Sequence, residues 1–538
     1  MNNRISGRRA FLKTSAVATT AAIAPVHGKA QQKKRKPNVI FIITDDQKLG
    51  DFGFIGGQAL TPHIDKLAGN SMYFGRGYVS TSVCTPSRYT CLTGQYASRS
   101  KAETFLNSTS VEGQTKIGWN TNMGDGEETV ASVLQQQGYA TGFVGKWHLS
   151  GPKPEKVDIE SDPTDPRVAK ILRNNQEQLC RHIRSFGFDY AAHVHWGNLK
   201  NYPCRALGQH NLEWTVDGAL AFMEQHKDEP FYLYFSTSLQ HGPDRVESLN
   251  ADPRITEAGL LDVPPDVMPS RSSVLARVNK AGLDEKQAPP TWLDDGVGAL
   301  MQKLDDLNLT EDTLVIYFND HGMEGGKGSL YEGGIRTPMF MHWPDVVKPG
   351  KSNALVQNID FVQTIFDACD VEPPGTLQPD GISLLPLLRV EVSNVRDSVY
   401  SEIGHTRAVT TDRWKYLAFR IPPSAELTLG QRQKILDGYA ERKKSSDALE
   451  SSFVNDVNLP ITHIGEIPGG NGTERGAALK YYPNHYYDAD QLYDLQEDPR
   501  EEHNLVGEPQ YQEVLSEMKK LLTGHLERVP GTFGEFKQ

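Results

Sequence analysis

Cysteine is scarce in this sequence. Its 538 residues contain five cysteines, at Cys84, Cys91, Cys180, Cys204 and Cys369. A set this sparse and odd in number excludes a small disulfide-stabilised scaffold. None of the five lies in a C-x-x-C pair, so no structural zinc site of that type is expected. Cys180 and Cys204 lie in one polar region and remain a candidate pair, because spacing alone does not decide a disulfide.

Long apolar runs and a basic excess are also absent. No stretch approaches the roughly 18 apolar residues of a membrane-spanning helix, so no integral membrane span is expected. The formal net charge is -12, which argues against a nucleic-acid partner and, at this coarse level, against a polyanionic substrate. The length fits one large α/β domain with a smaller domain beside it.

The first thirty residues differ from the rest because they carry bases and no acid. Arg8 and Arg9 precede Phe-Leu-Lys, a mildly apolar stretch at 16–24, and small residues near 28–30. This order is typical of an export signal and resembles a bacterial twin-arginine signal. We therefore expect residues 1–30 to be a signal peptide for the twin-arginine export machinery. The mature chain would then be periplasmic or extracellular.

Four short apolar segments, rich in β-branched and aromatic residues, predict strands that are buried on both faces. They span residues 39–43, 140–144, 231–235 and 313–318. Segments with helical periodicity lie between them, at 61–68, 128–137 and 294–307. This alternation predicts an α/β fold whose large domain has a mostly parallel, mixed central sheet flanked by helices.

Beyond about residue 386 the pattern changes to short strands at 399–402, 408–411 and 414–419, with a helical segment at 511–526. It predicts a smaller C-terminal α+β domain with an antiparallel sheet. We expect a catalytic domain over 37–385 and a C-terminal subdomain over 386–538. The polar segment 422–487 is expected to be a surface insertion.

Charged or imidazole side chains follow each of the four predicted strands. In chain order they are Asp45 and Asp46, then Lys146 and His148, then His241, then Asp320 and His321. Open α/β sheets bind ligands at the carboxyl ends of their strands. Aspartates there are hard oxygen donors that suit Ca²⁺ or Mg²⁺, although two adjacent aspartates alone also fit a helix cap beside a solvated acid.

The segment from Cys84 to Arg88, Cys-Thr-Pro-Ser-Arg, is the most specific signal in the chain. Pro86 suits the first turn of a helix, which would place Cys84 at the positive end of that helix and Arg88 about one turn along. An anion would find backbone N–H groups and a guanidinium there. The residues alone leave Cys84 open as a reactive thiolate or as a buried structural cysteine.

With the following Leu92-Thr93-Gly94, this segment resembles the C-x-P-S-R-x-x-x-L-T-G signature of the formylglycine-dependent sulfatases, relatives of the alkaline phosphatases. Further segments resemble the family in the family's order, at 37–46, 61–65, 145–148, 320–322, 331–338 and 492–505. The resemblance implies an alkaline-phosphatase-like fold. It also implies that a formylglycine-generating maturation enzyme converts Cys84.

The resemblance further implies one divalent cation, usually calcium. Its ligands would be Asp45, Asp46, Asp320, an oxygen of formylglycine 84 and the residue after Asp320. That residue is His321 here, where the family often has Asn, so Mg²⁺ stays open beside Ca²⁺.

The same resemblance implies a ring of side chains around the sulfate, namely Arg88, Lys146, His148, His241 and Lys327. A sulfate monoester gains negative charge on its bridging oxygen as the S–O bond breaks, which calls for fixed cations and an acid. Asp320 would accept a proton from the attacking hydroxyl, and His241 or Lys327 would protonate the leaving alcohol. His148 would then deprotonate the second hydroxyl of the formylglycine hydrate.

The predicted function is therefore hydrolysis of sulfate monoesters, with a sulfated carbohydrate as substrate. Residues 150–211, the segment 422–487, and His405 with Arg407 are candidate sugar contacts. Two alternatives stay open: a phosphonate monoester or phosphodiester hydrolase with the same aldehyde, and an unmodified anion-binding protein. A nucleotide-binding loop around Lys327 is excluded because His321 stands where its first glycine is required.

Overall fold

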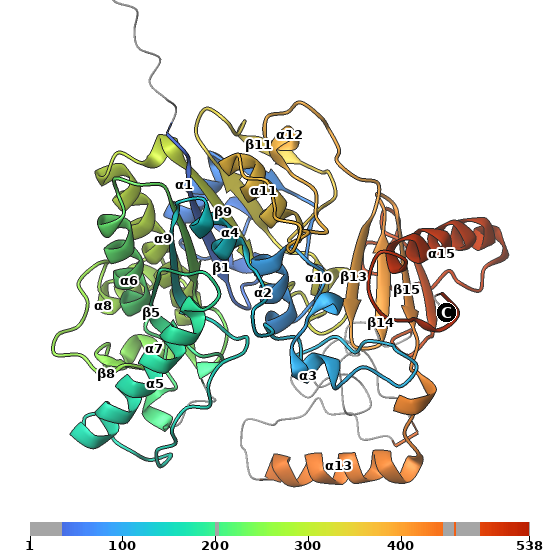
Figure 1. Cartoon of the computed structure of the whole chain (residues 1–538), viewed down its shortest axis with the longest axis horizontal. Helices are drawn as coiled ribbons and strands as arrows, with labels where there is room; N and C mark the ends of the chain where they lie inside the picture. Colours follow the sequence, from blue (N-terminus) through green and yellow to red (C-terminus); the bar gives the residue numbers. More distant parts are fainter. Residues whose placement is uncertain (1–34, 200–203, 445–456, 459–484, 537–538) are drawn as a thin grey trace, which may run out of the picture. The chain divides into compact units, whose positions relative to one another are not determined.

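The strand β1 (Asn38–Thr44) is buried along its whole length and lies within an eight-stranded sheet (Figure 1). Val39, Phe41 and Ile43 pack into one hydrophobic core, whereas Ile40 and Ile42 pack into another. Burial on both faces explains why this segment is apolar without alternation. The computed structural model describes residues 35–199, 204–444, 457–458 and 485–536.

The sheet is mixed but mostly parallel. Its other strands are β2 (Met72–Phe74), β4 (Ala140–Lys146), β5 (Tyr190–His195), β6 (Phe231–Ser236), β9 (Thr313–Asn319), β10 (Met339–His342) and β11 (Gly350–Ser352). Their order across the sheet is β11-β2-β10-β9-β1-β6-β4-β5. Only β10 runs antiparallel to its neighbours in this sheet. All four predicted strands are present, and they are adjacent as β9-β1-β6-β4.

Helices cover both faces of this sheet (Figure 1). The core with Ile40 and Ile42 is completed by α1 (Pro62–Gly69), α6 (Leu212–Gln225), α7 (Arg245–Asn250), α8 (Arg271–Lys280) and α9 (Ala288–Asp306). The opposite core is completed by α2 (Cys84–Thr93), α3 (Glu103–Leu106), α4 (Val130–Gln136), α5 (Pro166–Arg184), α11 (Asp360–Cys369) and α12 (Leu385–Leu388). The helix predicted at 294–307 begins earlier, at Ala288, because the first turn of a helix accepts Pro289 and Pro290.

A second, antiparallel sheet follows near the C-terminus. It consists of β13 (Val399–Ile403), β14 (Thr406–Thr410), β15 (Trp414–Phe419) and β16 (Asp490–Asp494). The helix α15 (Gln512–Leu526) packs on β14 and β15. The predicted fold class is thereby confirmed, although β16 was not predicted as a strand.

Short elements complete the described chain: β3 (Gly77–Tyr78) with β12 (Val356–Gln357), β7 (Ile255–Thr256) with β8 (Gly259–Leu260), and α10 (Glu332–Ile335). The helix α13 (Leu429–Lys444) lies within the predicted insertion 422–487, most of whose remainder is outside the described residues. The domain boundary at residue 385 stays a prediction.

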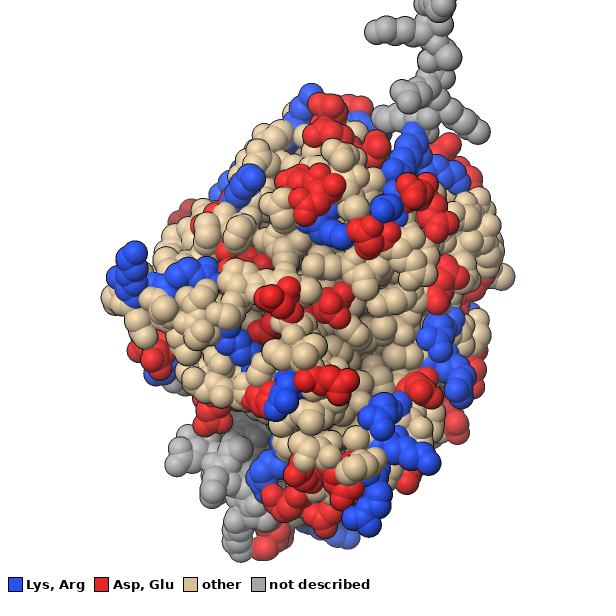
Figure 2. Space-filling model, turned by 90° about the vertical axis from the view of Figure 1, so that its left-hand side faces the viewer, with Lys and Arg blue, Asp and Glu red and all other residues tan. Residues whose placement is uncertain are grey.

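The described helices include none that is long and apolar enough to cross a membrane. The predicted signal peptide, residues 1–30, lies outside the described residues. Cys180 and Cys204 are both free thiols and form no disulfide. Figure 2 shows acidic and basic side chains interspersed on one face of the molecule, so the acidity of the chain is spread over that face.

Candidate active site

The carboxyl ends of β9, β1, β6 and β4 meet at one edge of the sheet because these four strands are adjacent and parallel. Asp45 and Asp46 directly follow β1, Lys146 ends β4, and Asp320 and His321 directly follow β9. Cys84 is the first residue of α2 and lies among them. The topology thus brings together side chains that are up to about 280 positions apart in the sequence.

Five side chains form a compact group of potential metal ligands. One ligand atom from each lies within 4.8 Å of all the others, and the five residues are Asp45, Asp46, Cys84, Asp320 and His321. Within the described residues, the buried Oδ1 atom of Asp320 has no hydrogen-bond partner. An oxygen-rich donor set with an unfilled acceptor fits a hard divalent cation.

Three basic side chains pair with the three aspartates of this group. The Nζ atom of Lys146 donates to Asp45, and the Nζ atom of Lys327 donates to Oδ1 of Asp46 at 2.6 Å. The guanidinium of Arg88 donates to Oδ2 of Asp320 at 3.0 Å. All six side chains are buried or nearly so. The aspartates and the cations therefore hold one another within a small volume.

The imidazoles occupy three different positions. Nε2 of His321 lies 3.2 Å from Oδ1 of Asp46 and 3.5 Å from Sγ of Cys84. Nε2 of His241 lies 3.8 Å from Oδ2 of Asp46. The Nδ1 atom of His148 is buried and has no hydrogen-bond partner in the described part of the chain. His321 therefore lies within the charged group, and His241 and His148 lie at its rim.

These contacts and burial act in opposite directions on the pKa values of the aspartates, and the contacts have the larger effect. Burial alone would raise the pKa of Asp45, but Lys146, and after it His241 and Arg88, lower that pKa far below its usual range. Burial is likewise outweighed at Asp46, whose pKa is lowered by Lys327 and by the hydrogen bond with His321. The two aspartates are therefore ionised at any physiological pH.

The histidines divide into two groups. Burial, followed by the charges of Lys146 and Arg88, lowers the pKa of His148 well below its ordinary value. Burial also lowers the pKa of His241. His321 differs, because Asp320 and the hydrogen bond with Asp46 outweigh burial and raise its pKa. His148 and His241 are therefore neutral near pH 7.

The backbone at the strand ends is unusual in ways that aim these side chains. Gly145, next to Lys146, has φ +92, and a Cβ atom there would lie 1.9 Å from the carbonyl oxygen of Ser236. Only glycine allows this approach of β4 to β6. Asp46 and His148 have φ values of 56 and 53, the left-handed region that side-chain-bearing residues rarely adopt.

The loop that carries Asp320, His321 and Lys327 is supported from α10. The N–H of Gly322 donates to the carbonyl of Gly334 at 2.9 Å. On the far side of α10, the buried Nζ atom of Lys415 in β15 lies 2.8 Å from both Glu332 and Glu501. We call Lys415, Glu332 and Glu501 the brace cluster, because it ties the small sheet to the helix behind the loop.

Sequence reasoning missed two residues that hold the predicted ones in place. Oδ1 of Asn198 accepts a hydrogen bond from Lys146 at 2.7 Å, and Oγ of Ser236 accepts one from Arg88 at 2.5 Å. Ser236 ends β6 and was detectable as another polar residue at a strand end. Asn198 lies in a polar region without periodicity and gave no signal. Arg407, a candidate sugar contact, is buried and donates to backbone carbonyls instead.

Comparison with protein families agrees with this geometry. The family model described as sulfatase matches residues 37–371. The chain belongs to the sulfatase family. A second model, N-sulphoglucosamine sulphohydrolase, C-terminal, matches residues 320–427. The predicted family resemblance and the predicted enzyme class, a sulfuric ester hydrolase, are confirmed.

Individual sulfatases show how far the likeness extends. The N-acetylgalactosamine-6-O-sulfatase of Bacteroides thetaiotaomicron is 28% identical over 469 residues, covering 73% of this chain and 85% of its own. Human arylsulfatase A is 28% identical over 417 residues, covering 71% and 74%. The structure of BT4656 in complex with its substrate D-glucosamine 2-N,6-O-disulfate has a TM-score of 0.57 at 19% identity, covering 92% and 98%, and shows the shared fold.

Proposed function

We propose that this sulfatase hydrolyses sulfate monoesters of carbohydrates, with a formylglycine made from Cys84 as nucleophile and one divalent cation beside it. The observation that carries the proposal is the group of Asp45, Asp46, Cys84, Asp320 and His321 at the strand ends, within 4.8 Å of one another. The relatives named for sulfated sugars support the carbohydrate substrate.

The cation would be held by the carboxylates of Asp45, Asp46 and Asp320 with His321. Ca²⁺ suits the oxygen donors, and Mg²⁺ is the alternative. When bound, it would lower the pKa of a hydroxyl at position 84 and offset the negative charge of the ester.

An unmodified thiol at position 84 is a poor candidate for the nucleophile. Burial, and then the negative charges of Asp320 and Asp45, raise the pKa of the Cys84 thiol, so the thiolate fraction is small. A formylglycine hydrate would instead supply two hydroxyls, one to attack sulfur and one to release sulfate.

The remaining side chains bind the ester and move protons. Arg88, Lys146 and Lys327 would bind the sulfate oxygens, because a bound metal ion would share the aspartates that these cations now contact. Asp320 would accept the proton of the attacking hydroxyl. The leaving alcohol would take its proton from Lys327 or from His241, and His241 would first have to bind a proton because its imidazole is neutral near pH 7. His148, neutral near pH 7, accepts the proton of the second hydroxyl.

Mass spectrometry of the peptide that contains position 84, taken from active protein, tests the nucleophile. We expect the aldehyde or its hydrate in the active fraction. An intact thiol in fully active protein would exclude the formylglycine mechanism.

Steady-state kinetics test the ester class. We expect a higher kcat/KM for 4-nitrophenyl sulfate than for 4-nitrophenyl phosphate at saturating Ca²⁺. A strong preference for the phosphate ester would favour the phosphoester or phosphonate hydrolase alternative.

We also propose that residues 1–30 direct export through the twin-arginine machinery, so that the maturation enzyme meets Cys84 before the folded protein leaves the cytoplasm. The predicted location is periplasmic or extracellular. N-terminal sequencing of exported protein should find a start near Gln31, and an exported chain that still begins at Met1 would contradict this.

A further inference from the structure

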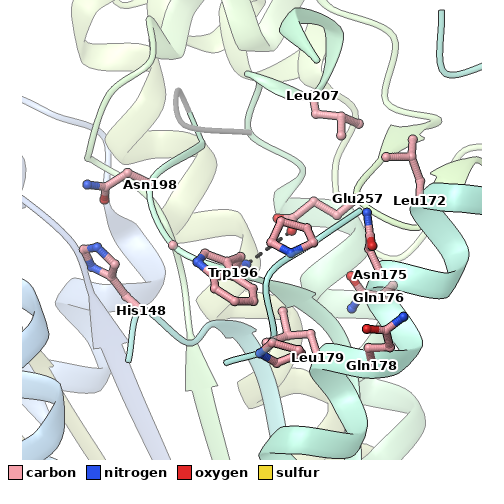
Figure 3. Close-up of a pocket in the computed structure, with 13 residues that line it drawn as sticks. His148, Leu172, Asn175, Gln176, Gln178, Leu179, Trp196, Asn198, Leu207 and Glu257 are labelled. Atoms are coloured by element: carbon pink, nitrogen blue, oxygen red, sulfur yellow. Dashed lines mark hydrogen bonds between the residues drawn. The ribbon is translucent and has the colours of Figure 1, made fainter. Parts of the chain in front are cut away.

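A cavity of about 310 Å³ opens beside His148, between β5, the segment that follows it, and α5 (Figure 3). Its volume is at the lower end of the roughly 300–1,000 Å³ typical of small-molecule sites. The described lining residues are His148, Pro152, Pro154, Leu172, Asn175, Gln176, Gln178, Leu179, Trp196, Gly197, Asn198, Leu207 and Glu257. We call it the Trp196 pocket.

We propose that the Trp196 pocket binds the sugar ring of the leaving alcohol and selects a ring that carries no second sulfate. This inference rests on the proposed function, because it assigns the part of the substrate that the charged group does not contact.

The pocket is continuous with the catalytic side chains. A Cβ atom at Gly197 would lie 2.9 Å from Cδ2 of His148, so this glycine lets the imidazole pack directly on the pocket wall. The next residue, Asn198, accepts a hydrogen bond from Lys146 at 2.7 Å. One short segment therefore lines the pocket and contacts two residues of the proposed site. The alcohol of an ester whose sulfate lies at Lys146 would therefore be within reach of this wall.

The wall of the Trp196 pocket combines an aromatic surface with neutral hydrogen-bonding groups, and both suit a sugar ring. The indole of Trp196 supplies a flat apolar surface, with His148 on one side and the amide side chains of Gln176 and Gln178 on the other (Figure 3). Neutral amides donate and accept hydrogen bonds, as sugar hydroxyls do. Aromatic faces suit the C–H faces of a sugar because both are apolar bodies with polar edges.

The main chain at Trp196 is held by an acid. The backbone N–H of Trp196 donates to Oε2 of Glu257 at 3.2 Å, and Oε1 of Glu257 is hydrogen-bonded to Nδ1 of His195. This arrangement pre-organises the apolar wall before a ligand binds.

The charge of the wall argues for a neutral ring. Among its described lining residues there is no Lys or Arg, and Glu257 is an acid. A second sulfate in the pocket would lose hydration without gaining a cation, and it would face a carboxylate. Discrimination against the disulfated sugar therefore comes from repulsion as well as from missing contacts.

Kinetics with matched sugars test the inference. The monosulfated probe is whichever of N-acetylgalactosamine 6-sulfate, galactose 6-sulfate and glucose 6-sulfate the wild-type protein desulfates fastest, and the second probe is its 4,6-disulfate. We expect wild type to prefer the monosulfated sugar at least 10-fold in kcat/KM. Trp196→Ala should lower kcat/KM for that sugar at least 10-fold and leave inhibition by inorganic sulfate unchanged. Trp119 is a partly exposed tryptophan outside the pocket lining. Trp119→Ala is therefore the matched control and should behave as wild type.

A gain of specificity makes the test sharper. Gln178→Lys places a cation in the wall from an exposed position of α5, and it should improve kcat/KM for the disulfated sugar at least 3-fold. Asn174→Lys adds the same charge to the same helix outside the pocket lining and should not.

The outcomes separate this inference from the proposed function. If wild type desulfates neither 4-nitrophenyl sulfate nor any of the three monosulfated sugars, the proposed function fails. If it desulfates any of these but prefers the disulfated sugar, or if Trp196→Ala matches Trp119→Ala, only the assignment of the Trp196 pocket is overturned.

Discussion

Two buried clusters of charge in this chain use similar side chains in different surroundings. In the active site, three bases pair with three aspartates that also belong to a group of potential metal ligands. In the brace cluster, Lys415 and Glu501 are fully buried, and Lys415 is 2.8 Å from both of its acids. In the proposed function, a cation and a sulfate would replace the partners of the active-site pairs, whereas nothing in the proposed reaction replaces the partners of the brace pairs. Burial of ion pairs alone does not identify a functional site. A functional site is indicated when each charge can also bind another partner, such as a cation or an anionic substrate.

The largest expected effect is a loss of catalysis, with little loss of stability, when Cys84 is replaced. Cys84→Ala should lower kcat for 4-nitrophenyl sulfate by about 10⁴-fold or more, because the nucleophile is removed. The free energy of unfolding should change by less than about 1 kcal/mol, since Cys84 adjoins polar groups and its loss leaves little apolar void. Stopped assays and urea unfolding measure the two quantities.

Cys91→Ala is the matched control. Cys91 is also a buried cysteine of α2, but it lies in the hydrophobic core. It should keep most of the activity and lose about 1 kcal/mol of stability. If Cys91→Ala abolished activity as fully as Cys84→Ala, position 84 would not be special.

The next effect compares two of the buried lysines, Lys146 and Lys415. Lys146→Met should lower kcat/KM about 10² to 10³-fold with a smaller loss of stability, because Arg88 still lies 3.5 Å from Asp45. Lys415→Met should cost about 3 to 5 kcal/mol of stability, since it leaves two buried acids without their cation. Its kcat at a temperature where it remains folded should fall less than about 5-fold.

Urea unfolding and steady-state kinetics on both variants check this comparison. Equal losses of activity from Lys146→Met and Lys415→Met would show that the brace cluster acts in catalysis and not only in folding.

Much of this arrangement follows from the sequence in simple physical terms. The four strands are short apolar runs, and the polar residues that end them, such as Asp45 and Asp320, must meet once the strands are parallel. The remainder depends on tertiary contacts that leave no local pattern. Lys415 resembles a solvated charge in a strand, and Asn198 lies in a polar region without periodicity. β16 has only Leu492 and Tyr493 between polar residues, too few to predict a strand.

Removal of divalent cations should destabilise the protein through the active-site group and not through the brace cluster. In the presence of excess EDTA, activity should be lost and the free energy of unfolding should fall by about 2 to 3 kcal/mol, as expected for a ligand at 100 times its Kd. Lys415→Met should lose the same increment on chelation, because Lys415 lies outside the proposed cation site. Calcium titrations followed by thermal unfolding measure it, and an unchanged melting temperature would contradict a cation site at Asp45 and Asp46.

The smallest effect is a pH dependence of stability from the brace cluster. Burial and the neighbouring Glu332 raise the pKa of Glu501 to about 7. Between pH 5 and 8 the folded protein then binds more protons than the unfolded chain, so this residue makes stability fall as pH rises. Glu501→Gln should remove about 1 to 3 kcal/mol of that decline.

Urea unfolding of wild type and Glu501→Gln at pH 5 and pH 8 checks the sign. A variant that loses stability with pH as steeply as wild type would show that Glu501 is already ionised at pH 5 in the folded protein.

The left-handed backbone of Asp46 and His148 has a consequence for protein engineering. A residue with a side chain in that conformation costs on the order of 1–3 kcal/mol, which glycine would recover. A screen that selects this chain for heat resistance alone would therefore favour glycine at both positions and so discard the proposed metal ligand and the proposed proton acceptor. Any thermostability selection applied to this protein needs desulfation as a second criterion, because two of its left-handed residues, Asp46 and His148, belong to the proposed chemistry.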